Sequence, residues 1–124
     1  MKDRNMIEKF RVWDNIENQY VNNIGITSDG LLFQIDENKI NYIDNNDRFI
    51  VEYYIGKKDI NGKEIYEGDI VQSNYFVIPM KVIYCDEYAS FNLKYPHNND
   101  NRCSAEFHSD DILEIVDNIH KKIN

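Results

Sequence analysis

Apolar residues in the first half of the chain form short runs separated by polar turns. The runs are rich in β-branched and aromatic residues, and several alternate with polar positions, which is typical of strands that bury one face. Ser-Asp-Gly at 28–30 and Asp-Glu-Asn at 36–38 are turn signals between them. We therefore predict strands at Phe10–Asp14, Gln19–Val21, Leu31–Ile35, Lys39–Ile43 and Phe49–Ile55, with the first two joined as a hairpin over residues 9–22 and a loop at 44–47.

The second half shows the same pattern at closer spacing. Three apolar runs with tight connections predict strands at Asp69–Tyr75, Ile78–Tyr84 and Ala89–Leu93. Pro79 has no N–H group to donate, which predicts a sheet edge, a bulge or a strand start there. Residues 94–104 are polar and predict a long loop. The whole pattern indicates a mainly β protein.

The C-terminal segment from Ser109 onwards fits two structures. As a helix, it has Ser109 as N-cap, acids in the first turn, apolar residues at helical spacing and lysines in the last turn. As a strand over residues 113–120, it places Leu113, Ile115 and Ile119 on one face. The periodicity by itself favours the helix.

A polar, glycine-rich stretch, GKKDINGKEIYEGDIV at residues 56–71, lies between two predicted strands. Its Asn-Gly pair is a strong turn signal because both residues tolerate positive φ. Gly56 lets the chain leave its strand, Gly68 suits a turn before the next strand, and Asp69 can accept backbone N–H groups there. A phosphate-binding loop needs G-x-x-x-x-G-K-[ST] before a helix, and this stretch has a different order. We therefore expect a structural bend.

The same residues resemble a known family. YIGKKDINGKEIYEGDIV, at residues 54–71, resembles the TGLKDKNGKEIYEGDIV-like signature of the YopX family of phage and prophage proteins. KFRVWDNIENQYV resembles the opening FRAWD segment of that family, and LEIVDNIH resembles its closing EVIGNIYE segment. Ile55 departs from the usual Thr-containing lead-in, and Asp117 stands where glycine is common.

The resemblance implies a small, largely β protein whose role is unassigned. It implies one YopX-like domain over residues 1–124, with an N-terminal β-rich lobe at 1–55 and an SH3-like barrel at 56–124. Because the closing segment of the family is strand-like, we predict a strand at 113–120, preceded by a helical turn at 109–112. The signature residues, which we expect to be structural, are Gly56, Asp59, Asn61, Gly62, Ile65, Tyr66, Glu67, Gly68, Asp69, Ile70 and Val71.

Composition narrows the class of partner. The chain has 124 residues, 42% of them hydrophobic, which suffices for one domain with a real core, and a formal net charge of −8. Lysine and arginine form no cluster longer than a pair, so binding to a nucleic-acid backbone is disfavoured. The sequence shows neither a membrane-length apolar run nor a signal core, which predicts a cytoplasmic protein. In that compartment Cys85 and Cys103 are expected to be free thiols.

Candidate chemistry is sparse. His97, His108 and His120 are scattered without metal-ligand spacing, so we expect neither a metal site nor a cofactor. Cys103 with His108 is a conceivable nucleophile and base. The acid pairs at 86–87 and 110–111 are more typical of solvated turns. If an acid acts, Glu67 and Asp69 are the best candidates, although turn formation explains both.

Trp13, the single tryptophan, is either a core residue or a contact for a partner. Because no catalytic constellation is apparent, we interpret the chain as a non-enzymatic phage or prophage accessory protein that binds another protein. Nine tyrosines exceed what a small core hides, and open sheet edges favour a homo-oligomer. The alternatives are an acidic inhibitor or mimic directed at host defence or nucleic-acid machinery and, last, a small hydrolase.

Overall fold

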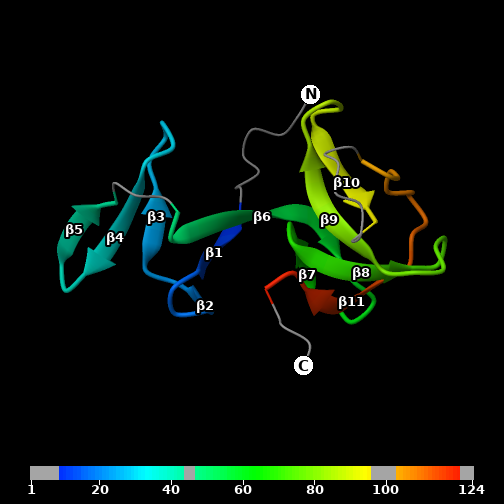
Figure 1. The fold of residues 1–124 in the computed structure, drawn as a ribbon, viewed down its shortest axis with the longest axis horizontal. Helices are drawn as coiled ribbons and strands as arrows, with labels where there is room; N and C mark the ends of the chain where they lie inside the picture. The colour runs from blue at the N-terminus through cyan, green and yellow to red at the C-terminus, as the bar shows by residue number, and fades with distance from the viewer. Residues whose placement is uncertain (1–8, 44–46, 96–102, 121–124) are drawn as a thin grey trace. The chain divides into compact units, whose positions relative to one another are not determined.

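The computed structural model of the chain describes residues 9–43, 47–95 and 103–120, and within these ranges it contains strands and turns but no helix (Figure 1). The mainly β fold class is thereby confirmed. The strands are β1 (Phe10–Asp14), β2 (Gln19–Val21), β3 (Ile24–Ile26), β4 (Leu32–Asp36), β5 (Lys39–Tyr42), β6 (Phe49–Lys58), β7 (Glu64–Tyr66), β8 (Asp69–Ser73), β9 (Met80–Cys85), β10 (Ser90–Lys94) and β11 (Leu113–Asn118).

The chain divides into two compact units, Lys9–Glu52 and a second that begins at Tyr53. Strand β6 supplies residues to both units, and it pairs with β1 and with β7 in a sheet of order β2-β1-β6-β7.

The N-terminal unit is built from hairpins. Strands β1 and β2 pair antiparallel, with Trp13 opposite Tyr20, and β3, β4 and β5 form a three-stranded antiparallel sheet. Successive side chains of a strand point to opposite faces of the sheet. Val12 therefore lies on the face of β1 that packs into the core, and Trp13 lies on the other face. The buried core consists of Val12, Ile24, Leu32 and Phe49, with Phe10, Val21, Ile26, Ile43 and Val51 packed against it.

The C-terminal unit is an antiparallel sheet of order β10-β9-β8-β11, joined by the β6–β7 hairpin. Leu93 of β10 also bridges to Ala105, so the chain after the 95–103 connection runs beside β10. The core consists of Ile65, Val71, Met80, Val82, Leu93 and Leu113. The closure of these strands into an SH3-like barrel stays a prediction.

Most predicted strands are confirmed within two residues at each end, including the hairpin over residues 9–22 and the strand start after Pro79. The C-terminal strand is also confirmed, because β11 pairs with β8 over Leu113–Asn118. The helix that periodicity favoured is therefore wrong. Only a single turn precedes the strand, closed by a bond from the Asp111 N–H to the His108 carbonyl.

Two short strands, β3 and β7, escape the sequence pattern. Each has three residues, which is too few for an alternation to stand out, whereas β2, of the same length, was predicted as the second strand of a hairpin. The stretch at residues 56–71 is therefore a hairpin with strands on both sides of its turn. The expectation that the chain leaves its strand at Gly56 is wrong. Gly56 lies within β6, at positive φ, where the pairing with β7 shifts register.

Candidate interaction surface

Asp59 organises the turn at the tip of the β6–β7 hairpin. One carboxylate oxygen accepts the N–H groups of Asn61 and Lys63, both at 2.9 Å, and the other accepts the N–H of Ile115 on β11 at 3.1 Å. Burial raises the pKa of Asp59, but the three N–H donors together outweigh it and hold the pKa below its ordinary value. Gly62 takes positive φ in this turn, whereas Asn61 does not.

The other two acids of the signature also bind backbone. Glu67 accepts the Tyr53 N–H at 2.8 Å, and the buried Asp69 accepts the Tyr66 N–H at 2.8 Å. Between them Gly68 is buried with a φ of 90°, as its place in the turn predicted. Such a φ strains any side chain with a Cβ.

The remaining signature residues face the core or continue the strands. Ile65 and Val71 are fully buried in the C-terminal core, and Ile70 pairs with Lys81 of β9. The Tyr66 ring lies 5.7 Å from that of Tyr54 on the paired strand. Every contact described for the signature can thus be explained by folding.

Trp13 lies outside the hydrophobic core, on the opposite face of β1 from Val12. Its ring makes an edge-on contact with Tyr20 at 5.0 Å, and its indole N–H donates to Asn15. Tyr20 is also covered by the Arg11 guanidinium and donates its hydroxyl to the buried Glu52. Trp13 is thus partly buried and is not among the residues of the N-terminal core cluster, and its role as a core residue or as a partner contact stays a prediction.

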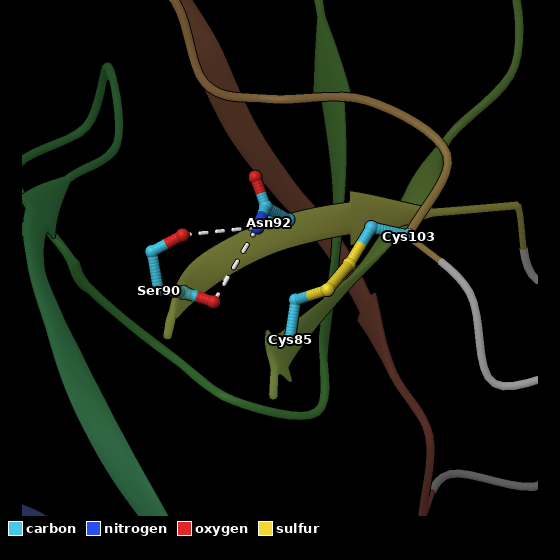
Figure 2. Close-up of a disulfide and its surroundings, with 4 residues drawn as sticks. All are labelled: Cys85, Ser90, Asn92 and Cys103. Atoms are coloured by element: carbon cyan, nitrogen blue, oxygen red, sulfur yellow. Dashed lines mark hydrogen bonds between the residues drawn. A yellow bond between two sulfur atoms is a disulfide. The ribbon is translucent and has the colours of Figure 1, made fainter. Parts of the chain in front are cut away.

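The prediction of two free thiols is wrong, because Cys85 and Cys103 form a disulfide (Figure 2). The return of the chain beside β10 brings Cys103 to the buried Cys85, with 6.2 Å between their Cα atoms. Nearby, buried Asn92 donates to the carbonyl and hydroxyl oxygens of Ser90 (Figure 2). The cytoplasmic assignment loses the support that free thiols would have given it.

The conceivable Cys103–His108 pair is excluded, since the Cys103 sulfur is bonded to Cys85. His97 lies outside the described residues. His108 packs against the Tyr75 ring, with 4.3 Å between ring centroids. Within the part of the chain that the structure describes, no group of three or more His, Cys, Asp or Glu side chains could hold a metal ion. The same part contains no helix that could span a bilayer.

The loop between β8 and β9, residues 74–79, connects these two strands (Figure 1). It carries exposed apolar side chains that the sequence analysis did not single out. Val77 is 97% exposed, and Tyr75 and Ile78 are also exposed. Ile112 is a fourth exposed apolar residue. Its backbone is bound to the loop, since its N–H donates to the Asn74 side chain at 2.8 Å and its carbonyl accepts the Asn74 N–H. We call Tyr75, Val77, Ile78 and Ile112 the apolar tip.

Side-chain contacts fix the conformation of this loop. The Tyr75 N–H donates to the hydroxyl of buried Ser73, and the Phe76 carbonyl accepts the Gln72 side-chain N–H at 2.6 Å. Phe76 turns inward and packs against the C-terminal core, unlike its neighbours. The apolar tip is thus held in place before any partner binds.

An acid borders the apolar tip. The Tyr75 hydroxyl donates to Asp110 at 2.6 Å. That hydrogen bond lowers the pKa of Asp110, so its carboxylate stays charged at neutral pH. Asp111 accepts from the Ser73 hydroxyl and from the His108 N–H. The predicted acid pair at 110–111 therefore lies in a turn beside the loop.

Comparison with known proteins agrees with the signature. The family described as YopX protein matches residues 9–123, which is nearly the whole chain. The chain belongs to the YopX family. Among curated proteins, none matches this YopX chain.

The fold of this YopX protein is similar to that of a solved structure, "Crystal structure of protein EF1440 from Enterococcus faecalis". The TM-score is 0.56 at 24% sequence identity, and the match covers 92% of this chain and 94% of the other. At that identity the likeness concerns the fold alone.

The apolar tip escaped the sequence analysis of this YopX protein for a simple reason. Tyr75 and Ile78 continue the apolar runs of β8 and β9 and were predicted as strand ends, and Val77 was predicted to lie in the tight connection between them. The one signal in the sequence was Pro79, which marks the start of β9 and therefore limits how far that strand can extend backwards.

Proposed function

We propose that this YopX protein is a non-enzymatic phage or prophage accessory protein that acts by binding another protein through the apolar tip. The observation that carries the proposal is the exposure of Val77, Tyr75 and Ile78 on a loop that the fold holds in place. Single exposed apolar residues are common on any protein, but several on one short loop indicate a contact site.

The fixed conformation of the loop supports this role. Binding costs less when the contact residues are ordered beforehand, since no loop entropy is lost on association. Tyr75 adds a large ring whose hydroxyl is already hydrogen-bonded to Asp110, so it can be covered without leaving that donor unpaired. The apolar tip therefore suits insertion into a preformed apolar pocket.

The charge around the apolar tip indicates which residues should border the pocket of the partner. Asp110 lies next to the apolar tip, and the chain has 22 acidic and 14 basic residues. An anionic lipid surface or a nucleic-acid backbone would be repelled by such a site. We therefore expect a protein partner whose apolar pocket is bordered by lysine or arginine.

The test compares proteins recovered from phage-infected or lysogenic cells by the tagged protein and by two variants. Val77→Ser with Ile78→Ser removes two of the four apolar side chains of the apolar tip. Ile16→Ser with Ile60→Ser removes two exposed apolar side chains outside the apolar tip and is the matched control. We expect a protein that is recovered by the parent and the control and lost with the tip variant, and whose purified form binds the variant at least about tenfold more weakly.

Two results would contradict the proposal. One is a partner that binds the parent and the tip variant equally. The other is micromolar, salt-sensitive binding to duplex or single-stranded DNA or RNA in a mobility-shift assay at about 50 mM salt, where phosphate contacts are strongest. Circular dichroism of each variant establishes that it is folded.

A further inference from the structure

The sheet β3-β4-β5 of the N-terminal unit has apolar side chains on both faces. Its inner face supplies Ile24 and Leu32 to the core. On its other face, the register places Phe33 opposite Tyr42 and Ile35 opposite Ile40. We call Phe33, Ile35, Ile40 and Tyr42 the outer face.

The outer face is exposed chiefly on β5, an edge strand of this sheet. Ile40 is 60% exposed and Tyr42 is 65% exposed, whereas the Phe33 ring lies across Gly25, where any Cβ would collide with it. Every residue of β5 is exposed. Exposed edge strands with apolar side chains favour pairing with another chain.

The hydrogen bonds of β4 show which backbone groups of β5 point outward. The Ile43 N–H donates to the Leu32 carbonyl, and the Ile35 N–H donates to Asn23 on the side of β3. Because hydrogen-bonded and non-bonded pairs alternate in an antiparallel ladder, Ile40 and Tyr42 are non-bonded partners of β4. Their N–H and C=O groups therefore point away from β4, along an edge where no other described strand pairs.

We infer that two copies of this chain associate by antiparallel pairing of their β5 strands. The register that uses all the outward groups is symmetric about Asn41, with Ile40 of each copy opposite Tyr42 of the other. Each such pair exchanges two N–H to carbonyl bonds, and Asn41 faces its own counterpart as a non-bonded pair. A two-fold axis at Asn41 makes the contact isologous and closed.

Charge permits this contact between two acidic chains. The only charged residue of β5 is Lys39, so the pairing brings no carboxylates together across the seam. In the register, Lys39 lies opposite Ile43 of the second copy. Self-association of a chain with net charge −8 is most favourable where its acids are absent.

The contact area sets the expected strength. Ile40 and Tyr42 of both copies form a continuous apolar surface next to the new ladder, but two four-residue strands cover less than the ~1,200 Å² of a stable complex. We therefore expect a reversible dimer with a dissociation constant of about 10 to 500 µM. This inference concerns the N-terminal unit and does not depend on the proposed function.

Sedimentation velocity of the protein from about 5 µM to about 1 mM tests the inference, because the range brackets that of weak interfaces. We expect a concentration-dependent monomer–dimer equilibrium. Ile40→Pro removes an outward N–H and leaves the β4 ladder intact, so it should weaken the dimer at least about tenfold through the two bonds lost by symmetry. Ile60→Lys, on an exposed turn of the other unit, is the control and should dimerise like the parent.

A charge exchange tests the register. A chain with Ile40→Lys and Tyr42→Lys should be monomeric, as should one with Ile40→Glu and Tyr42→Glu, whereas their equimolar mixture should form a heterodimer. Asn41→Cys should cross-link two copies under mild oxidation, since non-bonded partners lie about 4.5 Å apart, whereas Asn15→Cys should not.

Two outcomes would overturn the inference. The first is a parent protein that stays strictly monomeric to the highest concentration together with no Asn41→Cys cross-link. The second is a dimer that forms equally well in the parent and in both like-charged variants, which would place the contact on a different surface.

Discussion

The two units hold their buried carboxylates in partly different ways: both use turn N–H groups, and in the N-terminal unit arginine side chains also take part. In the N-terminal unit, Asp14 is 2% exposed and receives two bonds from the Arg48 guanidinium, at 2.8 and 2.7 Å. Glu52, also buried, pairs with Arg11 at 2.8 Å. Each of these acids has a cation from a distant part of the sequence, 34 or 41 residues away, as its partner.

In the C-terminal unit, the buried carboxylates bind backbone N–H groups. Asp59 and Asp69 accept from residues two to four positions away, and Asp59 also reaches β11. A carboxylate that binds its own turn needs only a short contiguous sequence, whereas an ion pair needs two strands already in register. The stretch at residues 56–71 thus contains both acids and the turn N–H groups that they accept.

The largest expected effect is the loss of the Asp59 carboxylate. Asp59→Ala leaves three backbone N–H groups without their acceptor and should lower the free energy of unfolding by about 3 kcal/mol or more. Urea unfolding followed by far-UV circular dichroism measures this. Asp59→Asn keeps one oxygen for the turn and should lose clearly less. A loss under about 1 kcal/mol for the alanine variant would break the contrast between the units.

The disulfide gives the next effect. Replacing both cysteines by alanine should destabilise the C-terminal unit by roughly 3 kcal/mol, because the bond closes a loop of 18 residues in the unfolded chain. Trp13 fluorescence reports on the N-terminal unit, since the chain has one tryptophan, and its transition should shift less than that of the circular dichroism. Recovery of two thiols from the denatured, unreduced protein would show that the bond does not form.

A smaller effect is expected at Gly68. Gly68→Val should cost about 1 to 2 kcal/mol, because valine is strained at a φ of 90° in a buried turn. Glu67→Gln is the control, since its amide oxygen can still accept the Tyr53 N–H, and it should melt close to the parent. If Gly68→Val melts like the parent, the turn does not require glycine.

The last prediction concerns Asp14, whose contribution to the stability of the fold depends on pH. The Arg48 guanidinium lowers the pKa of Asp14 from 3.8 to about 2 against the opposing effect of burial, and the N–H groups of Ile16 and Glu17 assist. A depressed carboxyl pKa stabilises the fold above about pH 4 and loses that contribution as the pH falls through 2.

Unfolding followed by Trp13 fluorescence should therefore show that the parent loses stability as the pH falls from about 4 to about 2. Asp14→Asn should be less stable than the parent at pH 6, and the difference should shrink as the pH falls. A constant difference across this range would mean that the pairing with Arg48 does not control the N-terminal unit.

The sequence predicted the elements whose information is local. The hairpin at residues 9–22, the turn at 36–38 and the positive φ of Gly68 follow from alternation and turn residues within a few positions. The choice between strand and helix at Leu113–Asn118 needed the family resemblance, because an amphipathic segment of that length fits both patterns. Its pairing with β8 decides the matter physically.

By itself, the sequence determined that the chain is mainly β, where most strands run and which family it belongs to, because these depend on residues close together in the chain. Only the tertiary structure decided the Cys85–Cys103 bond, the ion pair of Asp14 with Arg48 and the exposure of Val77. Each depends on which distant segments meet. That outcome is set by sheet register and by burial, which no local pattern specifies.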